Sequence, residues 1–291
     1  MAEEIKIPLE VAVFSPGSAL YAQELGVHRV ELNARGSYDV GGLTPDVADV
    51  KNLYFPPPGQ KKLDIPIRIM IRPRPAPGPT APEPVDFIYS DAEFNAMKRA
   101  IKQFKKLGVL NPIRGDAFVF GILERCLGYD SGDEELPKPG STILDRRLGV
   151  DKRRCRILVE LAKPVRCVFH RAFDLLAEED DWKMSINELA RCDFTGVLTS
   201  GGNGPFYENI DMIGPICQHM SGLQLIVGGG LRRQNVNMLI DKVRKVQPGL
   251  NLWAHSSCLA RGKVEGDSNS EDVDGQEVRQ LSTMLGLDFP E

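Results

Sequence analysis

Two segments of the chain carry side chains and backbone groups that suit proton transfer and anion binding. His170 ends an apolar run and is followed by Arg171 and, four residues after the histidine, by Asp174. An imidazole with a cation and a carboxylate nearby can act as a general acid or base, and the carboxylate can orient the ring. A second apolar run ends in three consecutive glycines, residues 228–230, whose backbone N–H groups could approach an anion.

Further polar residues follow the other apolar runs. They are Ser15, Glu31, Asn33, Arg35, Arg72, Arg74, Glu124, Thr199, Ser200, His255, Ser256 and Ser257. Charges beside buried strands are costly unless they are paired or belong to a site. We therefore predict a site with Glu31, His170 and Asp174 as its catalytic residues. The predicted substrate-binding residues are Arg72, Arg171, Thr199, Ser200, Gly228, Gly229, Gly230, His255 and Ser256, since guanidinium groups favour carboxylate and phosphate oxygens.

Each of these features also has a structural interpretation. His170 could belong to an ion pair that only stabilises the fold, and His255 could be a core histidine bonded to a backbone carbonyl. Three glycines are also typical of a tight turn. The sequence leaves both interpretations open at each position.

The cysteines give a narrower case for a metal site. The chain has six, scattered singly and without a C-x-x-C pair, so reduced thiols are expected rather than disulfides. Copper(I) prefers thiolate and thioether ligands, and only Cys126 and Cys258 come just after predicted strands. These two are the predicted metal ligands, and the other four are expected to be buried and inert.

The elements that must position these residues alternate along the chain. Eight short apolar runs predict strands, most of them continuous rather than alternating, as in a parallel sheet buried on both faces. They span 9–15, 29–34, 66–72, 117–123, 165–170, 196–200, 223–228 and 250–256. Eight strands separated by helices predict a single-domain (β/α)8 TIM barrel over residues 1–291. An open doubly wound sheet is the alternative, but the turn after the first strand has only one glycine.

Helix start signals support the alternation. Ser18 is predicted to begin a helix over 19–25, and Thr44 is predicted to cap another with Pro45 in its first turn. Ser90 and Glu93 form a capping-box pattern before a helix over 91–107. Further helices are predicted at 142–162, 183–192, 206–220, 233–244 and 273–285.

Composition excludes several classes of protein. Lys and Arg number 36 against 40 Asp and Glu, which gives a net charge of −4 with no block of five or more like charges. Nucleic acid and membrane are therefore not expected partners. The acidic amino terminus does not resemble a secretory signal, and we expect a cytoplasmic protein. No organic cofactor is predicted, and self-association through helix faces is an open alternative.

Three segments depart from the regular alternation. Residues 73–84 hold six prolines, residues 124–140 are acidic and rich in glycine, and residues 264–274 are polar. The first two follow predicted strands, so they are expected at the rim that carries the site, either as solvated loops or as a cover.

Several motifs together resemble the CutC family of copper homeostasis proteins. They lie at 29–32, 41–45, 69–74, 89–94, 119–121, 169–174, 198–201, 228–230 and 255–257. The resemblance implies a (β/α)8 barrel, cytosolic copper handling, cuprous ion as the ligand and cysteines as donors. Family members commonly have a cysteine where this chain has Asn33, and a short turn where this chain has its proline-rich segment.

Two functions follow from these observations. The resemblance implies a protein that binds Cu(I) through Cys126 or Cys258. The ring of acids, arginines and His170 instead predicts an enzyme, an isomerase, lyase or hydrolase, for a small anionic substrate, either phosphorylated or not. No lysine follows a predicted strand, which argues against an imine-forming aldolase.

Overall fold

The computed structural model describes residues 6–126, 147–220, 222–244, 251–260 and 271–287. Eight parallel strands close into a barrel in the order β1-β2-β3-β4-β7-β8-β9-β10, with β10 pairing back to β1. Their bounds are β1 Leu9–Val13, β2 Arg29–Leu32, β3 Ile67–Met70, β4 Ala117–Phe120, β7 Arg166–Phe169, β8 Gly196–Thr199, β9 Gln224–Val227 and β10 Leu252–Ser256. Each lies within one of the eight predicted strand ranges, and the predicted barrel is confirmed.

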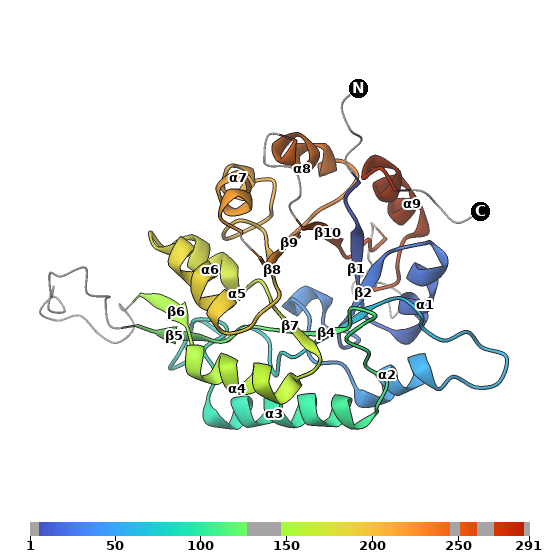
Figure 1. The fold of residues 1–291 in the computed structure, drawn as a ribbon, viewed down its shortest axis with the longest axis horizontal. Helices are drawn as coiled ribbons and strands as arrows, with labels where there is room; N and C mark the ends of the chain where they lie inside the picture. Colours follow the sequence, from blue (N-terminus) through green and yellow to red (C-terminus); the bar gives the residue numbers. More distant parts are fainter. Residues whose placement is uncertain (1–5, 127–146, 221, 245–250, 261–270, 288–291) are drawn as a thin grey trace, which may run out of the picture.

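Helices surround the barrel (Figure 1). They are α1 Pro16–Glu24, α2 Val47–Tyr54, α3 Asp91–Lys106, α4 Lys152–Ala162, α5 Ala172–Ala177, α6 Trp182–Arg191, α7 Ile210–His219, α8 Val236–Val243 and α9 Gly275–Met284, with a short 3₁₀ turn, η1, at Tyr38–Val40. The α5 helix was not predicted from the sequence. Among the described residues, no helix is long and apolar enough to cross a membrane.

A small hairpin interrupts the alternation after β4. Strands β5 Leu123–Arg125 and β6 Leu148–Val150 pair antiparallel outside the barrel, next to α4 and α6 (Figure 1). The predicted helix at 142–162 is therefore wrong at 148–150, where the chain is β6, and its residues 142–146 lie outside the described part. Of the polar segments 124–140 and 264–274, residues 127–140 and 264–270 also lie outside it.

The helix caps correct two predictions. Ser15, not Ser18, caps α1, since its hydroxyl accepts the N–H of Ser18 at 3.0 Å. Asp46, not Thr44, caps α2, because the Thr44 hydroxyl instead donates to the carbonyl of Arg72 at 3.0 Å and accepts its N–H at 2.8 Å. Thr44 thus joins the loop after β2 to the end of β3. The capping box of α3 is present as predicted.

Alternation along the strands separates two apolar layers. Leu9, Val11 and Val13 of β1 join the large cluster that packs the barrel against its helices. A smaller cluster fills one side of the interior, with Val119, Val168, Leu198 and Ile226 from β4, β7, β8 and β9. The inward-facing side chains of β1, β2, β3 and β10 are largely charged: Glu10, Arg29, Glu31, Arg68 and His255.

The segments around Ile7 and Leu285 meet at the amino-terminal edge of the barrel. The N–H of Ile7, just before β1, donates to the carbonyl of Leu285, just after α9, at 3.0 Å. This leaves the carboxyl-terminal edge of the strands, where the predicted site residues follow each strand, for the loops between strands and helices.

Candidate active site

A cavity of about 460 Å³ opens at the carboxyl-terminal ends of the strands. A volume of this order suits a small-molecule ligand. Residues of β1, β2, β3, β8 and β10 line it, together with loop residues that include those after β7 and β9. The residues that carry its chemistry are Glu31, Asn33, Asp39, Arg72, Phe87, His170, Arg171, Gly229, Gly230, Arg232, His255, Ser256 and Ser257.

A carboxylate inside the barrel orients His255. Nδ1 of His255 lies 2.7 Å from Oε1 of Glu10, which is fully buried. Burial alone would raise the pKa of Glu10, but the positive charges of Arg29 and Arg68 outweigh it and hold that pKa well below its usual value. An ionised Glu10 accepts, so Nδ1 of His255 carries the proton and Nε2 is left for exchange.

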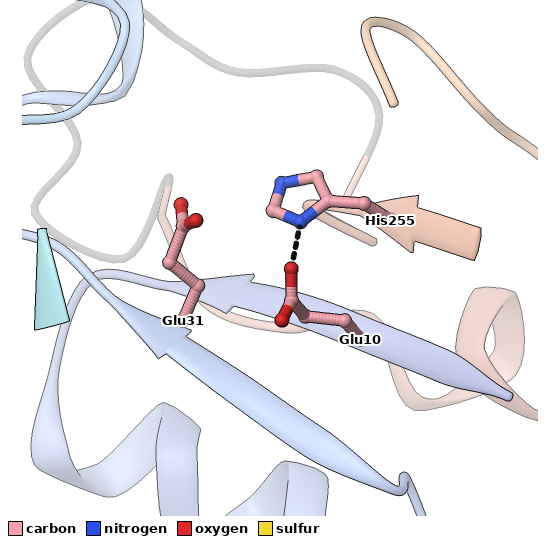
Figure 2. Close-up of side chains that lie close together, drawn as sticks. All are labelled: Glu10, Glu31 and His255. Atoms are coloured by element: carbon pink, nitrogen blue, oxygen red, sulfur yellow. Dashed lines mark hydrogen bonds and ion pairs between the residues drawn. The ribbon is translucent and has the colours of Figure 1, made fainter. Parts of the chain in front are cut away.

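Glu31 lies beside this pair, and Figure 2 shows all three side chains pointing toward one another. Glu31 is 3% exposed, its Oε1 accepts from Nδ2 of Asn33 at 3.3 Å, and its Oε2 is buried with no hydrogen-bond partner. One ligand-type atom from each of Glu10, Glu31 and His255 lies within 4.8 Å of the other two.

The pKa values of Glu31 and His255 are shifted in a way that favours a retained proton. Burial, reinforced by the charge of Glu10, raises the pKa of Glu31. Burial opposes protonation of His255, but the charge of Glu31 and the bond to Glu10 outweigh it and raise the pKa of His255. Both shifts favour the protonated forms, so the two groups are suited to exchange a proton with a bound molecule.

The same three residues are the only group of metal-ligand type found among the described residues. Carboxylates and imidazole suit zinc, manganese or iron(II) better than copper(I). Both Glu10 oxygens are already engaged, Oε1 by His255 and Oε2 by Arg29 and Arg68. Two guanidinium charges in contact with one ligand oppose a divalent cation, so proton exchange fits this cluster better than metal binding.

His170 is held as a neutral imidazole. Its Nδ1 accepts the N–H of Ala172 at 3.2 Å, and its ring packs on Phe87 with centroids 4.6 Å apart. Burial, with the charge of Arg72, lowers the pKa of His170 to about 3. The proton then sits on Nε2, which is buried without a partner. Gly121 leaves room for the ring, because a Cβ there would lie 2.7 Å from Nδ1.

Asp174 does not orient His170. Its Oδ1 accepts from the Thr199 hydroxyl at 2.6 Å and the Ser200 N–H at 2.8 Å, and its Oδ2 accepts from Ser200 Oγ and Arg171 Nε. Burial raises the pKa of Asp174. This carboxylate therefore fixes the loop after β8 and holds Arg171 at the cavity edge, while Asp174, Thr199 and Ser200 themselves lie behind the lining.

The segment after β3 brings Phe87 to the cavity and Asp86 to the arginine that lines it. Asp86 binds Nη2 of Arg72 at 2.7 Å and lies 3.4 Å from Nη1 of Arg74. Phe87 follows with a φ of 67°, a left-handed backbone that is strained for an aromatic residue, and it lines the cavity between Arg72 and His170. The charge of Arg72 is therefore balanced by Asp86. Phe87, which comes shortly after the proline-rich segment, forms part of the cavity wall.

The glycine turn lies where the sequence predicted it. Gly229 and Gly230 line the cavity, and both have φ near 83°. Gly228 lies just below, and a Cβ there would lie 3.0 Å from Cδ2 of His255, so this glycine makes room for the histidine. Arg232 comes next and donates to the hydroxyls of Ser256 at 2.6 Å and Ser257 at 2.7 Å.

The predicted thiol ligands lie elsewhere. Cys258 is fully buried, and burial raises its pKa to about 12. Cys126 comes directly after β5, within the β5–β6 hairpin, and burial raises its pKa too. Neither thiol lines the cavity, and among the described lining residues only Met70 carries sulfur. Both thiols are weaker thiolate donors than an exposed cysteine.

Eight of the predicted catalytic and binding residues line the cavity: Glu31, Arg72, His170, Arg171, Gly229, Gly230, His255 and Ser256. Four further residues of the site and its surroundings were not predicted from the sequence: Glu10, Asp86, Phe87 and Arg232. One signal was available for Glu10, since it is a single charged residue within the apolar stretch of β1. A charge in a strand buried on both faces indicates an interior partner.

A closed parallel barrel with ionisable groups at its carboxyl edge defines an α/β barrel of the kind that hosts small-molecule sites. A family model matches residues 7–125 and 137–249, and the chain belongs to the CutC family.

Solved structures agree with this assignment. CutC from Streptococcus agalactiae, described as a candidate copper homeostasis protein, is 25% identical with a TM-score of 0.60, over 86% of this chain and 98% of that one. The 3-hexulose-6-phosphate synthase of Salmonella typhimurium is 12% identical with a TM-score of 0.50, over 96% and 98% of the two chains. The second likeness shows the fold alone.

Proposed function

We propose that this CutC-family barrel is an enzyme that acts on a small anionic substrate by proton transfer at the cavity. The observation that carries the proposal is the buried carboxyl of Glu31, which lies close to His255 beside a cavity that three arginines also line, and the pKa of both groups is raised. A structural ion pair would have its oxygens satisfied, whereas Oε2 of Glu31 is buried without a partner. Perturbed carboxyl and imidazole groups in a cleft are typical of catalytic sites.

Each group has a role that follows from its surroundings. Glu31 and Nε2 of His255 exchange a proton with the substrate, and Glu10 fixes the tautomer of His255. The neutral imidazole of His170 donates a hydrogen bond from Nε2 to the substrate oxygen on which negative charge develops. His170 does this without changing its own protonation state. Asp174 is a positioning residue that holds Arg171 through its short hydrogen bonds. Isomerisation, carbon–carbon cleavage and hydrolysis all use such a set.

The test follows proton exchange rather than one chosen reaction. Purified protein is incubated in D2O with a panel of small carboxylates and phosphate esters, and mass spectrometry records deuterium uptake or conversion. We expect at least one compound to react, with the rate falling about 10²–10⁴-fold in Glu31→Gln and His255→Asn. The matched control is Glu24→Gln, on an exposed pair with Lys61. Absence of any reaction with wild type, or unchanged rates in both site variants, would overturn the proposal.

Copper handling is the second candidate function, favoured by the family and by the description of the Streptococcus agalactiae relative. The ligands are Cys126 and Cys258, with Cu(I) as cargo. Thioether sulfur also suits Cu(I), and Met70 lines the cavity with His170 and His255. The raised thiol pKa values weigh against tight binding by the two cysteines alone.

An anaerobic Cu(I) titration against a competing chelator tests this candidate. If the thiols bind copper, the double variant Cys126→Ser, Cys258→Ser loses affinity, and the control Cys192→Ser, Cys217→Ser does not. Asn33→Cys places a thiol in the cavity lining, where family members commonly have one, and is expected to raise the affinity. Equal affinity in wild type and the first double variant removes Cys126 and Cys258 as the donors.

A further inference from the structure

The three arginines of the cavity differ in how their charge is balanced. Arg72 is paired with Asp86 at 2.7 Å, and Arg171 is paired with Asp174 at 2.7 Å. Arg232 instead donates to the Ser256 and Ser257 hydroxyls and to the carbonyl of Leu231, and no carboxylate of the described residues pairs with it. Within the described part of the chain, one end of the cavity therefore keeps a positive charge that no carboxylate pairs with.

The backbone beside Arg232 presents unused donors. The carbonyl of Gly229 accepts the N–H of Phe206 at 2.8 Å, and that of Gly230 accepts Nδ2 of Asn235 at 2.9 Å, which fixes both peptide groups. No described residue accepts a hydrogen bond from the N–H of either glycine. Their left-handed φ values exclude other residues without strain, and a Cβ on Gly229 would lie 2.7 Å from Cβ of Ser200.

Ser256, at the end of β10, and Ser257, just after it, use their hydroxyl groups differently. The Ser256 hydroxyl donates to the carbonyl of Leu231 at 2.7 Å and accepts from Arg232, so it is fully used in holding the guanidinium. The Ser257 hydroxyl accepts from Arg232, and its own proton has no acceptor among the described residues. Ser257, Arg232 and the two glycines all line the cavity.

We propose that Gly229, Gly230, Arg232 and Ser257 form a binding site for the phosphate group of a small phosphate monoester. A phosphate dianion has three terminal oxygens and accepts from several donors at once, whereas a carboxylate has two oxygens and half the charge. Two backbone N–H groups, a guanidinium and a hydroxyl offer the number of donors and the positive charge that suit a phosphate dianion better than a carboxylate. The inference rests on the proposed function and names the substrate class for that cavity.

The position of this site limits the substrate. Ser257 comes two residues after His255, and two residues along extended chain span roughly 7 Å. A phosphate at Ser257 therefore leaves space for a short carbon skeleton between it and Nε2 of His255. The acidic carbon or oxygen of the substrate lies a few bonds from the ester oxygen.

Binding of inorganic phosphate tests the site directly, by calorimetry at pH 7.5 and constant ionic strength. We expect a measurable affinity that falls at least tenfold in Arg232→Gln and partly in Ser257→Ala. The control is Arg233→Gln, because that arginine pairs with Glu277 and lines no part of the cavity. Melting curves verify that each variant is folded, and Arg232→Lys, which keeps the charge, should retain part of the affinity.

The outcomes separate this inference from the proposed chemistry. Glu31→Gln should bind phosphate as wild type does even though it slows proton exchange about 10²–10⁴-fold. Phosphate binding without any catalysed exchange would leave the site standing and overturn the proposed function. Undetectable phosphate binding at 10 mM, equal loss in Arg232→Gln and Arg233→Gln, or displacement by malonate as effective as by glycerol phosphate would overturn the phosphate site.

Discussion

At the residue scale, the two cavity histidines owe opposite properties to their neighbours. His255 touches one carboxylate and lies near a second, and its pKa is raised. His170 faces aromatic rings and Arg72, and its pKa is lowered to about 3. The surroundings of His255 thus favour its protonated form, and those of His170 favour its neutral form. The sequence suggested His170 as the proton carrier, because nothing in it reveals the burial or the ring partners.

The neutral state of His170 predicts a pH dependence of stability. Below pH 6.5 this histidine binds a proton in the unfolded chain but not in the folded protein. The free energy of unfolding therefore falls as the pH drops toward about 3. The loss is at most about 1.4 kcal/mol per pH unit. Urea denaturation at pH 7 and pH 4.5 should show a smaller acid loss in His170→Gln than in wild type. An equal loss in both proteins would contradict a neutral His170.

Glu31 is expected to reduce stability at neutral pH. Because its folded pKa is raised above 4.5, ionisation above that pH is easier in the unfolded chain, and stability falls as pH rises. Glu31→Gln should therefore unfold at a higher temperature at pH 8, with a gain on the order of 1 kcal/mol, and match wild type near pH 4. The exposed variant Glu24→Gln should change little. A less stable Glu31→Gln at pH 8 would show that Glu31 stabilises the fold.

At the element scale, the strands and most helices could be predicted because their signals are local. Apolar runs, the capping box at Ser90 and glycines at helix ends act within a few residues of the element they define. The β5–β6 hairpin and the role of the proline-rich segment could not be predicted, since both depend on contacts between distant loops. The cap of α2 also depends on a distant contact, because the Thr44 hydroxyl is bonded to the backbone of Arg72 and the Asp46 carboxylate accepts at the helix start instead.

One such contact joins the proline-rich segment to the hairpin. Arg125 of β5 binds both carboxylate oxygens of Glu83 at 2.8 Å, and the N–H of Leu123 donates to the carbonyl of Phe87 at 3.0 Å. Glu83→Gln should weaken this attachment by about 1–2 kcal/mol. Hydrogen exchange should then speed up at Phe87 and Leu123 and stay unchanged at α3. Glu160→Gln, in a surface pair with Lys163, is the matched control. Unchanged exchange at Phe87 would show that the hairpin does not hold this segment.

At the scale of the whole molecule, a single carboxylate joins four strands of the barrel. Glu10 on β1 contacts Arg29 on β2, Arg68 on β3 and His255 on β10. The same residue therefore ties the seam where the first and last strands meet and orients the proposed proton carrier. The sequence could predict which residues follow the strands but not this cluster, because Glu10 and His255 are 245 positions apart.

Loss of the Glu10 charge should destabilise the entire barrel. Glu10→Gln keeps the volume but leaves two buried guanidinium groups unpaired, which costs about 3–5 kcal/mol. Because the folded pKa of Glu10 is lowered, its contribution is complete above 4.5 and is lost as the pH falls below that value. Denaturant unfolding of wild type and Glu10→Gln should therefore converge in strong acid. A difference below about 1 kcal/mol at pH 7 would contradict this role.

The contact between Ile7 and Leu285 indicates where a tether or a linker can be attached to the barrel. Since both residues lie at the edge opposite the cavity, a covalent tether attached at either of them would hold the molecule with its mouth toward bulk solution. A peptide linker that joins these two positions would close the chain at that edge, so that new termini could be opened in a helix connection on the same edge without touching the residues that line the cavity.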